Sequence, residues 1–204
     1  MSSEPAAFDT GALDTVRLMA GLVGAALTQA QTFADSQHQA LHDALTRLPN
    51  RVLLLDRLQY ALQAAQRTEG AVSLLVLDLD GFKAVNDSFG HHVGDLVLQE
   101  VARRLSASLR GADTVGRLGG DEFAIVLPES DADEAGQVAT RILARLVLPM
   151  LVETRTLQVG GSIGIATSPG HGIEPDTLMR HADAAMYAAK RVGLHGAESS
   201  EQAA

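Results

Sequence analysis

An apolar run at residues 72–77 constrains the fold of this chain more than any other feature. Only Ser73 interrupts it, so its side chains do not alternate between apolar and polar as those of a half-exposed strand would. Such a run is typical of a strand buried on both faces, and a strand of that kind needs helices on both sides of its sheet. Asp78 and Asp80 follow directly. We therefore expect two acids at the carboxyl end of a central strand, where open sheets bind ligands.

The sequence on either side of this run predicts further helices and strands. Helical spacing of apolar residues predicts helices at 53–67, 93–109, 134–148 and 175–192. Shorter apolar runs predict strands at 115–118, 123–127, 156–159 and 162–167. Because hairpins are mixed with helical connections, we expect a mixed α+β domain, with a central mixed β-sheet flanked by helices.

Residues 13–44 precede this domain and predict one long helix. Apolar residues recur at every seventh position, and a second set follows three positions later, which favours a coiled coil between two copies of the chain. The alternative is an amphipathic helix packed on its own domain, and the alanine-rich seam with Gly21 and Gly24 favours this alternative. The first set is Leu13, Ala20, Leu27, Ala34 and Leu41, and the second is Val16, Val23 and Ala30, continued by Gln37 and Ala44. We expect a dimerisation helix in residues 1–44, a compact domain in 45–195 and a flexible tail in 196–204.

Composition narrows the classes of function. A formal net charge of -9 argues against a nucleic-acid backbone as the main partner, although it allows a nucleotide bound through metal ions. The absence of cysteine excludes disulfide and thiolate chemistry. The longest strongly apolar stretch is too short to span a bilayer, and residues 1–14 lack the basic cluster of a secretory signal. We expect a soluble cytoplasmic protein.

Two acidic motifs are candidates for chemistry. In DLDGFK, residues 78–83, two acids and a lysine follow the central strand, and carboxylate oxygens suit hard cations such as Mg²⁺ that keep phosphates as further ligands. In RLGGDEF, residues 117–123, a Gly-Gly pair between two apolar runs predicts a hairpin turn with two acids at its tip. Taken alone, the first motif also fits a polar loop, and the second fits a solvated hairpin.

Together with other segments in the same order, these motifs resemble the GGDEF family. The matching segments are DALTRLPNR at 43–51, DLDGFKAVND at 78–87, FGHHVGD at 89–95, GGDEF at 119–123, SIGIA at 162–166 and ADAAMYAAK at 182–190. The resemblance covers nearly all of residues 43–193. It implies a palm-like fold similar to nucleotide cyclases and polymerases. It also implies a diguanylate cyclase, a nucleotidyltransferase that condenses two GTP into cyclic di-GMP and two pyrophosphates across a homodimer.

The resemblance further implies roles for individual residues. Asp78 and Asp121, with the carbonyl of Leu79, would bind Mg²⁺, two ions per active site, for which Mn²⁺ can substitute. Asp121 or Glu122 would help to deprotonate the attacking 3′-hydroxyl. The substrate contacts would be Lys83 and Lys190 at the phosphates, Asn86 and Asp95 at the guanine, and His91 and Phe82 close by. Asp95 could equally be a capping residue near a helix start, and His91 could equally tie a loop.

Arg110 and Asp113 precede the signature at a spacing that resembles the family's inhibitory site for its own product, and Arg141 would add a second arginine. The alternative is a cation that ends a helix, followed by a turn acid. One position departs from the family, since Leu194 stands where an arginine often contacts phosphate. The alternatives to an active cyclase are therefore a weak or inactive domain that senses GTP or cyclic di-GMP, and a scaffold whose helix assembles partners.

Overall fold

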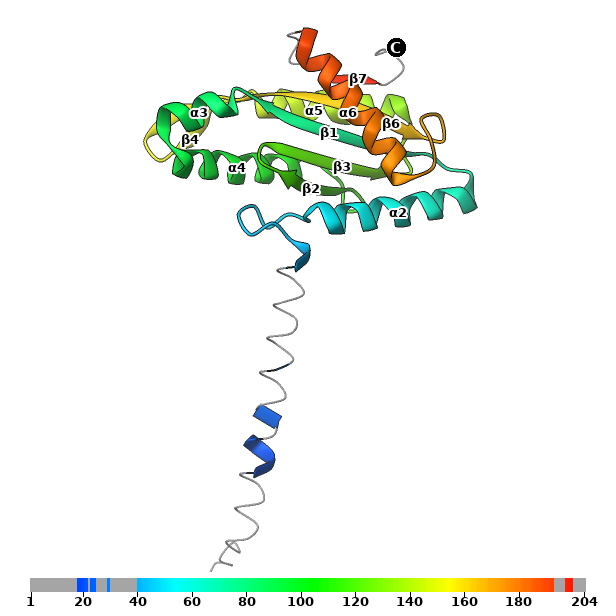
Figure 1. Cartoon of the computed structure of the whole chain (residues 1–204), viewed down its shortest axis with the longest axis horizontal. Helices are drawn as coiled ribbons and strands as arrows, with labels where there is room; N and C mark the ends of the chain where they lie inside the picture. The colour runs from blue at the N-terminus through cyan, green and yellow to red at the C-terminus, as the bar shows by residue number, and fades with distance from the viewer. Residues whose placement is uncertain (1–17, 22, 25–28, 30–39, 193–196, 200–204) are drawn as a thin grey trace, which may run out of the picture. The chain divides into compact units, whose positions relative to one another are not determined.

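The computed structural model describes residues 18–21, 23–24, 29, 40–192 and 197–199 (Figure 1). The chain divides into two units, residues 1–40 and 41–204. Most of the predicted heptad positions lie outside the described residues. The predicted helix end at Ala44 is wrong, because the helix stops at Leu41. Asp43 then accepts hydrogen bonds from the backbone N and the Oγ1 of Thr46, which closes a turn.

A five-stranded sheet in the order β2-β3-β1-β6-β7 forms the centre of the second unit. Its strands are β1 (Val72–Asp80), β2 (Thr114–Gly119), β3 (Glu122–Pro128), β6 (Gly160–Ser168) and β7 (Ala197–Ser199). Neighbouring strands are antiparallel except for the parallel pair β6 and β7. The mixed sheet and the central position of β1 are therefore confirmed.

Helices cover both faces of this sheet (Figure 1). Leu74 and Val76 of β1 pack in one core with two helices, α2 and α6. Leu75 and Leu77 pack in the other core with α4 and α5. The helices are α2 (Arg51–Thr68), α3 (Phe82–Phe89), α4 (His91–Ser106), α5 (Ala132–Leu146) and α6 (Pro175–Val192). Because side chains alternate along a strand, Asp78 shares the face of Val76 and points towards α6.

Four elements differ from the sequence-based expectation. Helix α3 is only eight residues long and buries just two side chains, Phe82 and Val85, so it has too few apolar positions for a periodic signal. Strands β4 (Met150–Val152) and β5 (Arg155–Leu157) form a separate two-stranded sheet of three residues each. Strand β7 pairs with β6 in a segment for which the sequence favours a frayed tail.

Candidate active site

The central strand ends with Asp78, whose side chain faces α6. Asp78 is 9% exposed and lies opposite Glu122 of β3 on one side and Ser162 of β6 on the other. Its Oδ1 accepts a hydrogen bond from the Nζ of Lys190 in α6 at 2.5 Å. The Ser162 hydroxyl donates to both carboxylate oxygens of Asp80 at 3.2 Å. Residues from β1, β3, β6 and α6 therefore meet at one end of the sheet.

Negative charge is concentrated at this end of the sheet. Burial raises the pKa of Asp78, and Asp121 and Asp80 raise it further, against the opposing effect of Lys190. Burial also raises the pKa of Glu122, with a further contribution from neighbouring acids. The hydrogen bond to Asp78 raises the pKa of Lys190. A bound cation would stabilise the charged form of such carboxylates.

The hairpin turn between β2 and β3 brings Asp121 to the same end of the sheet. Gly119 and Gly120 adopt φ angles of 150° and 53°, which favour glycine, so the predicted Gly-Gly turn is confirmed. The Asp121 carbonyl accepts a hydrogen bond from the backbone N of Leu79 at 3.3 Å. This bond ties the turn to the last residues of β1, so both acidic motifs belong to one site.

An ion pair between Arg117 and Asp43, which the sequence did not predict, connects the β2–β3 turn to the segment before α2. The guanidinium of Arg117 donates to the Gly120 carbonyl from Nε at 3.0 Å and from Nη2 at 2.7 Å. Its Nη1 donates to Oδ1 of Asp43 at 3.0 Å. Burial by itself would raise the pKa of Asp43, but hydrogen bonds from Thr46 and Arg117 lower it. The two residues are 74 positions apart, and no local pattern connects them.

Helices α3 and α4 place the Asn86 side chain against Gly94, the residue before Asp95. A Cβ atom on Gly94 would lie 2.0 Å from Oδ1 of Asn86, so the Asn86 side chain rests on the α4 backbone beside Asp95. His91 is the first residue of α4 and is exposed, as is Lys83 on α3. The Phe82 ring is part of the core, and this residue is 8% exposed.

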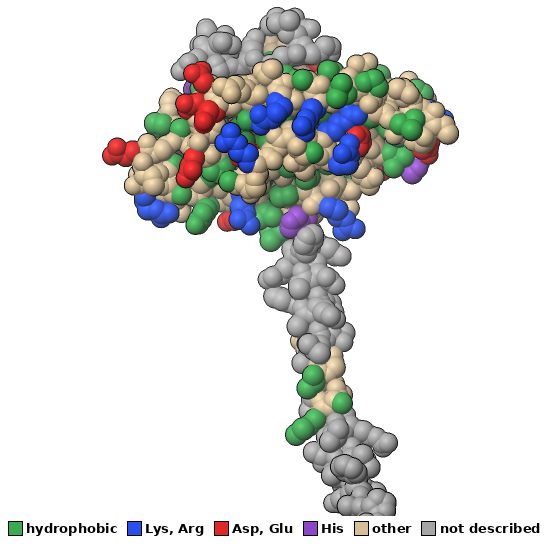
Figure 2. All heavy atoms as spheres, turned by 180° about the vertical axis from the view of Figure 1, so that it is seen from behind, with side chains coloured by type: hydrophobic (Ala, Val, Ile, Leu, Met, Phe, Trp, Pro, Cys, Tyr) green, Lys and Arg blue, Asp and Glu red, His purple; other side chains and the backbone are tan. Residues whose placement is uncertain are grey.

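The Arg-x-x-Asp segment forms a closed turn after α4. The backbone N of Arg110 donates to Oδ2 of Asp113 at 2.8 Å, and the backbone N of Asp113 donates to the Arg110 carbonyl at 3.1 Å. From α5, Arg141 donates through Nε and Nη2 to the Ser108 carbonyl at 3.2 and 3.0 Å. All three predicted residues therefore gather near the end of α4. Figure 2 views the molecule from behind Figure 1 and shows Lys and Arg side chains, in blue, gathered in the middle of that face.

A family model described as "Diguanylate cyclase, GGDEF domain" matches residues 40–195. The chain belongs to the GGDEF domain family. The GGDEF domain is 48% identical over 157 residues to the bifunctional diguanylate cyclase/cyclic di-GMP phosphodiesterase MucR of Pseudomonas aeruginosa, covering 77% of this chain and 23% of that protein. It is 43% identical over 160 residues to the diguanylate cyclase TpbB of the same species, covering 78% of this chain and 37% of that protein. The chain thus spans about a quarter to just over a third of these relatives.

Solved GGDEF domains share this fold. The isolated GGDEF domain of TpbB from Pseudomonas aeruginosa has a TM-score of 0.76 at 40% identity, with 78% of this chain and 94% of that chain covered. The coiled coil and GGDEF domain of DgcB from Caulobacter crescentus, solved in complex with c-di-GMP, has a TM-score of 0.78 at 26% identity. That match covers 91% of this chain and 98% of DgcB's solved chain.

Carboxylates that could bind a metal lie close together in this GGDEF domain, but no three of them form a closed cluster. Among the described residues, no three acidic, histidine or cysteine side chains are placed to hold a metal ion. Leu194, which departs from the family pattern, lies outside those residues. No helix in the described ranges has the length and apolar character needed to cross a membrane.

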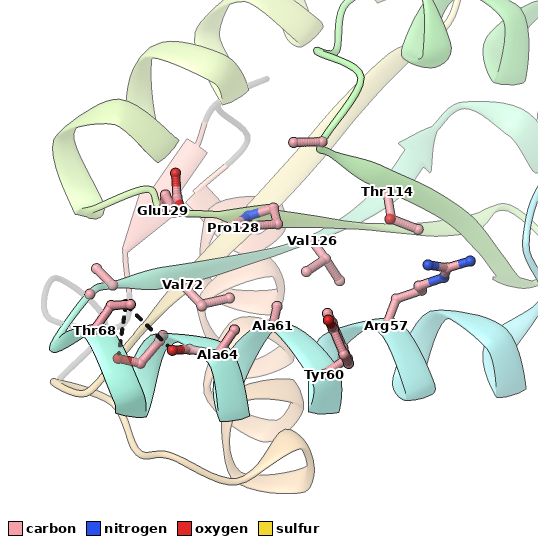
Figure 3. Close-up of a pocket in the computed structure, with 14 residues that line it drawn as sticks. Arg57, Tyr60, Ala61, Ala64, Thr68, Val72, Thr114, Val126, Pro128 and Glu129 are labelled. Atoms are coloured by element: carbon pink, nitrogen blue, oxygen red, sulfur yellow. Dashed lines mark hydrogen bonds between the residues drawn. The ribbon is translucent and has the colours of Figure 1, made fainter.

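A cavity of the GGDEF domain lies away from these acids. It has a volume of about 260 Å³ and lies between α2 and the strands β2 and β3 (Figure 3). Alanines and other apolar residues form most of its lining, with Arg57, Tyr60 and Glu129 also among the residues that line it. None of the residues predicted for catalysis, substrate or metal binding lines it.

Proposed function

We propose that this GGDEF domain is a diguanylate cyclase that condenses two GTP into cyclic di-GMP and two pyrophosphates. The observation that carries the proposal is the convergence of Asp78, Glu122 and Lys190 at the end of β1. The turn that carries Asp121 is tied to the same strand. Membership of a family whose relatives are named diguanylate cyclases supports the same reaction.

The donor atoms at this site suit Mg²⁺. Asp78 and Asp121 would supply carboxylate oxygens, and Leu79 would supply its carbonyl. Mg²⁺ commonly uses one or two carboxylates and completes its shell with water and substrate phosphates, so a closed cluster of three acids is not needed. When bound, two such ions would stabilise the oxygens that attack and leave the α-phosphorus. Lys190, which forms an ion pair with Asp78, would then be available to the phosphates.

The reaction forms one bond and breaks one bond in each of two equivalent steps. The 3′-oxygen of one GTP attacks the α-phosphorus of the other, and the bond to the bridging oxygen of pyrophosphate breaks. Asp121 or Glu122 accepts the proton of the 3′-hydroxyl. Lys83 and Lys190 balance the negative charge of the phosphates, since phosphoryl chemistry depends mainly on positioning and electrostatics. Because each domain holds one GTP, two copies must face each other across a two-fold axis.

Asn86 and Asp95 would select guanine over adenine. A carboxylate accepts hydrogen bonds from the N1–H and the 2-amino group of guanine, and adenine lacks this pair of donors. A site that leaves its polar groups unpaired with the wrong base can discriminate by roughly 10⁴-fold. The test is to incubate the purified chain with Mg²⁺ and either GTP or ATP and to separate the products by chromatography. We expect cyclic di-GMP from GTP and little product from ATP.

Asp95→Ser should relax this preference, with Asp56→Ser, at an exposed aspartate of α2, as the matched control. Equal use of ATP and GTP by the wild-type chain would contradict the role of Asn86 and Asp95. An unchanged preference in the Asp95 variant would contradict the role of Asp95 alone. Absence of any cyclic dinucleotide from the wild-type chain would contradict the cyclase itself.

A further inference from the structure

The hollow at the end of β1 extends beyond the residues that the proposed reaction uses. Besides Asp78, Glu122 and Lys190, its lining includes Arg180, Asp183 and Tyr187. The last three lie three and four positions apart on α6, a spacing that places side chains on one face of a helix. One exposed face of α6 therefore continues the hollow away from the acidic site.

This α6 face, defined by Arg180, Asp183 and Tyr187, combines an aromatic ring, a carboxylate and a guanidinium, which are groups that suit a nucleoside. Tyr187 is 63% exposed, in a chain that has only two tyrosines and no tryptophan. An exposed aromatic ring can stack on any base. Asp183 can accept hydrogen bonds from ribose hydroxyls. It also lies near the acidic site, since its charge contributes to the raised pKa of Glu122 after the effect of burial.

Arg180 retains donors for a ligand. Its Nε donates to the Asp176 carbonyl at 3.3 Å, and its Nη2 donates to Oγ1 of Thr177 at 3.2 Å. It makes no ion pair within the part of the chain that the structure describes. A guanidinium with remaining N–H groups suits the two acceptors on guanine or a phosphate oxygen.

The α6 face lies on the opposite side of the sheet from Asn86 and Asp95, which would hold the guanine of the first GTP. Asn86 and Asp95 are on α3 and α4, which pack in the core on the α5 side. Helix α6 packs in the other core. A nucleotide with its guanine at Asn86 and its phosphates at the acids would meet α6 at Lys190, near the C-terminal end of that helix, and the α6 face lies on the preceding turns. The attacking 3′-hydroxyl belongs to a different nucleotide, which must approach the same acids from another side.

We propose that Arg180, Asp183 and Tyr187 form a subsite for the ribose and guanine of the second GTP, the one bound by the partner copy of the chain. This inference rests on the proposed cyclase function. It adds that α6 of one copy contacts the nucleotide that α3 and α4 of the other copy hold. The subsite is thus used only when two copies face each other.

The test compares binding of the first GTP with turnover in the Tyr187→Ala variant. Binding is measured with a GTP analogue that cannot react, in the presence of Mg²⁺, and turnover is measured at saturating GTP. We expect the dissociation constant of the analogue to stay within about two-fold of wild type. We expect kcat to fall about ten-fold or more, the loss typical of removing one base-stacking contact. Tyr187→Phe keeps the ring, so its kcat should fall much less. Asp183→Asn should lower kcat without weakening binding of the analogue.

The matched control is Tyr60→Ala, which removes the other tyrosine of the chain, 67% exposed on α2 beside the separate cavity. It should behave as wild type in both measurements. The inference is overturned if Tyr187→Ala keeps the wild-type kcat or weakens binding of the analogue as much as it lowers kcat. It is also overturned if a higher protein concentration restores the rate, because Tyr187 would then be a dimer contact. Failure of the wild-type chain to form product would instead refute the cyclase function.

Discussion

The carboxylates of this domain fall into two groups according to the direction of their pKa shift. Asp78 and Glu122 have raised pKa values, because they are partly buried among other acids at the end of β1. The pKa of Asp43 is lowered because Thr46 and Arg117 donate to it, and the pKa of Glu100 is lowered because Arg103 and Arg104 donate to it. The hydrogen bonds of Asp43 and Glu100 connect different parts of the fold. The charged forms of Asp78 and Glu122 are disfavoured in their surroundings, and a bound cation would stabilise them.

Glu100 shows how the second group stabilises the fold. Arg103 donates to it from Nε and Nη2 at 2.7 Å, and Arg104 donates from Nε at 2.8 Å. The same Arg104 also donates to the carbonyls of Arg145, Leu146, Leu148 and Pro149, so it fastens α4 to the end of α5. Glu100 thereby holds Arg104 in place for these contacts.

Glu100→Gln should lower stability in a pH-dependent way. Hydrogen bonds from Arg103, opposed by burial and supported by Arg104, lower the pKa of Glu100 from 4.5 to about 2. A lowered pKa means that the contribution is fully present above the unfolded value and is lost as the pH falls from about 4.5 towards about 2. Thermal unfolding should therefore show a lower midpoint for the variant at pH 7 and a shrinking difference below pH about 4.5. The control is Glu174→Gln, at an exposed acid without an ion pair in the described residues. The account is contradicted if the difference in unfolding midpoint between wild type and Glu100→Gln stays constant as the pH falls.

At the scale of elements, the turn between α4 and β2 contains the residues that the sequence predicts for inhibition by the product. It carries Arg110 and Asp113, and Arg141 reaches it from α5. The guanidinium of Arg110 is exposed, while its backbone N is fixed by Asp113. Hydrogen bonds therefore hold the backbone of the turn while the Arg110 side chain stays exposed, and the turn precedes the β2–β3 hairpin in the sequence.

Arg110→Ala should keep turnover and lose inhibition by cyclic di-GMP. A guanidinium can donate to phosphate and stack on guanine, and such charge-assisted bonds are the stronger class. Losing one, at roughly 1.5–3 kcal/mol, should raise the inhibitory concentration by about ten-fold or more. Initial rates against added product test this, with Arg67→Ala, in the last turn of α2, as the matched control. Equal inhibition of wild type and the Arg110 variant would leave this segment as a helix end and a turn only.

The elements that the sequence predicted well are those with a strong local pattern. Strand β1 has a continuous apolar run, the β2–β3 turn has a Gly-Gly pair, and α6 has regular apolar spacing up to its observed ends. Helix α3 and the β4–β5 hairpin are too short for such a pattern. The pair of Asp43 and Arg117, and the α6 face, depend on which segments fold next to each other. Family resemblance found the acids, but not these contacts.

At the scale of the whole molecule, the proposed reaction would require a second copy of the chain. The second unit, residues 41–204, has its own two-sided core, and the first unit, residues 1–40, carries most of the predicted heptads. If the leading helix joins two copies, it raises the effective concentration of one domain near the other. Dimerisation and activity would then be linked through the first unit.

Deletion of residues 1–40 tests this role. The shortened chain should dimerise more weakly, and its specific activity should depend more steeply on protein concentration. Analytical ultracentrifugation and turnover over a dilution series measure the two effects. Equal specific activity of both chains at high dilution would remove the dimerisation role from this segment.

The central claim is that the acids at the end of β1 and in the β2–β3 turn serve chemistry rather than architecture. The most direct measurement is the formation of cyclic di-GMP from GTP and Mg²⁺ by Asp78→Asn and Asp121→Asn, together with thermal unfolding in the absence of Mg²⁺. Because Asp78 has a raised pKa and Asp121 lies in a turn, removing either charge should leave the unfolding temperature close to wild type. Both variants should lose synthesis, while Asp56→Asn should keep it. Near-wild-type turnover by either of the first two variants would contradict the account.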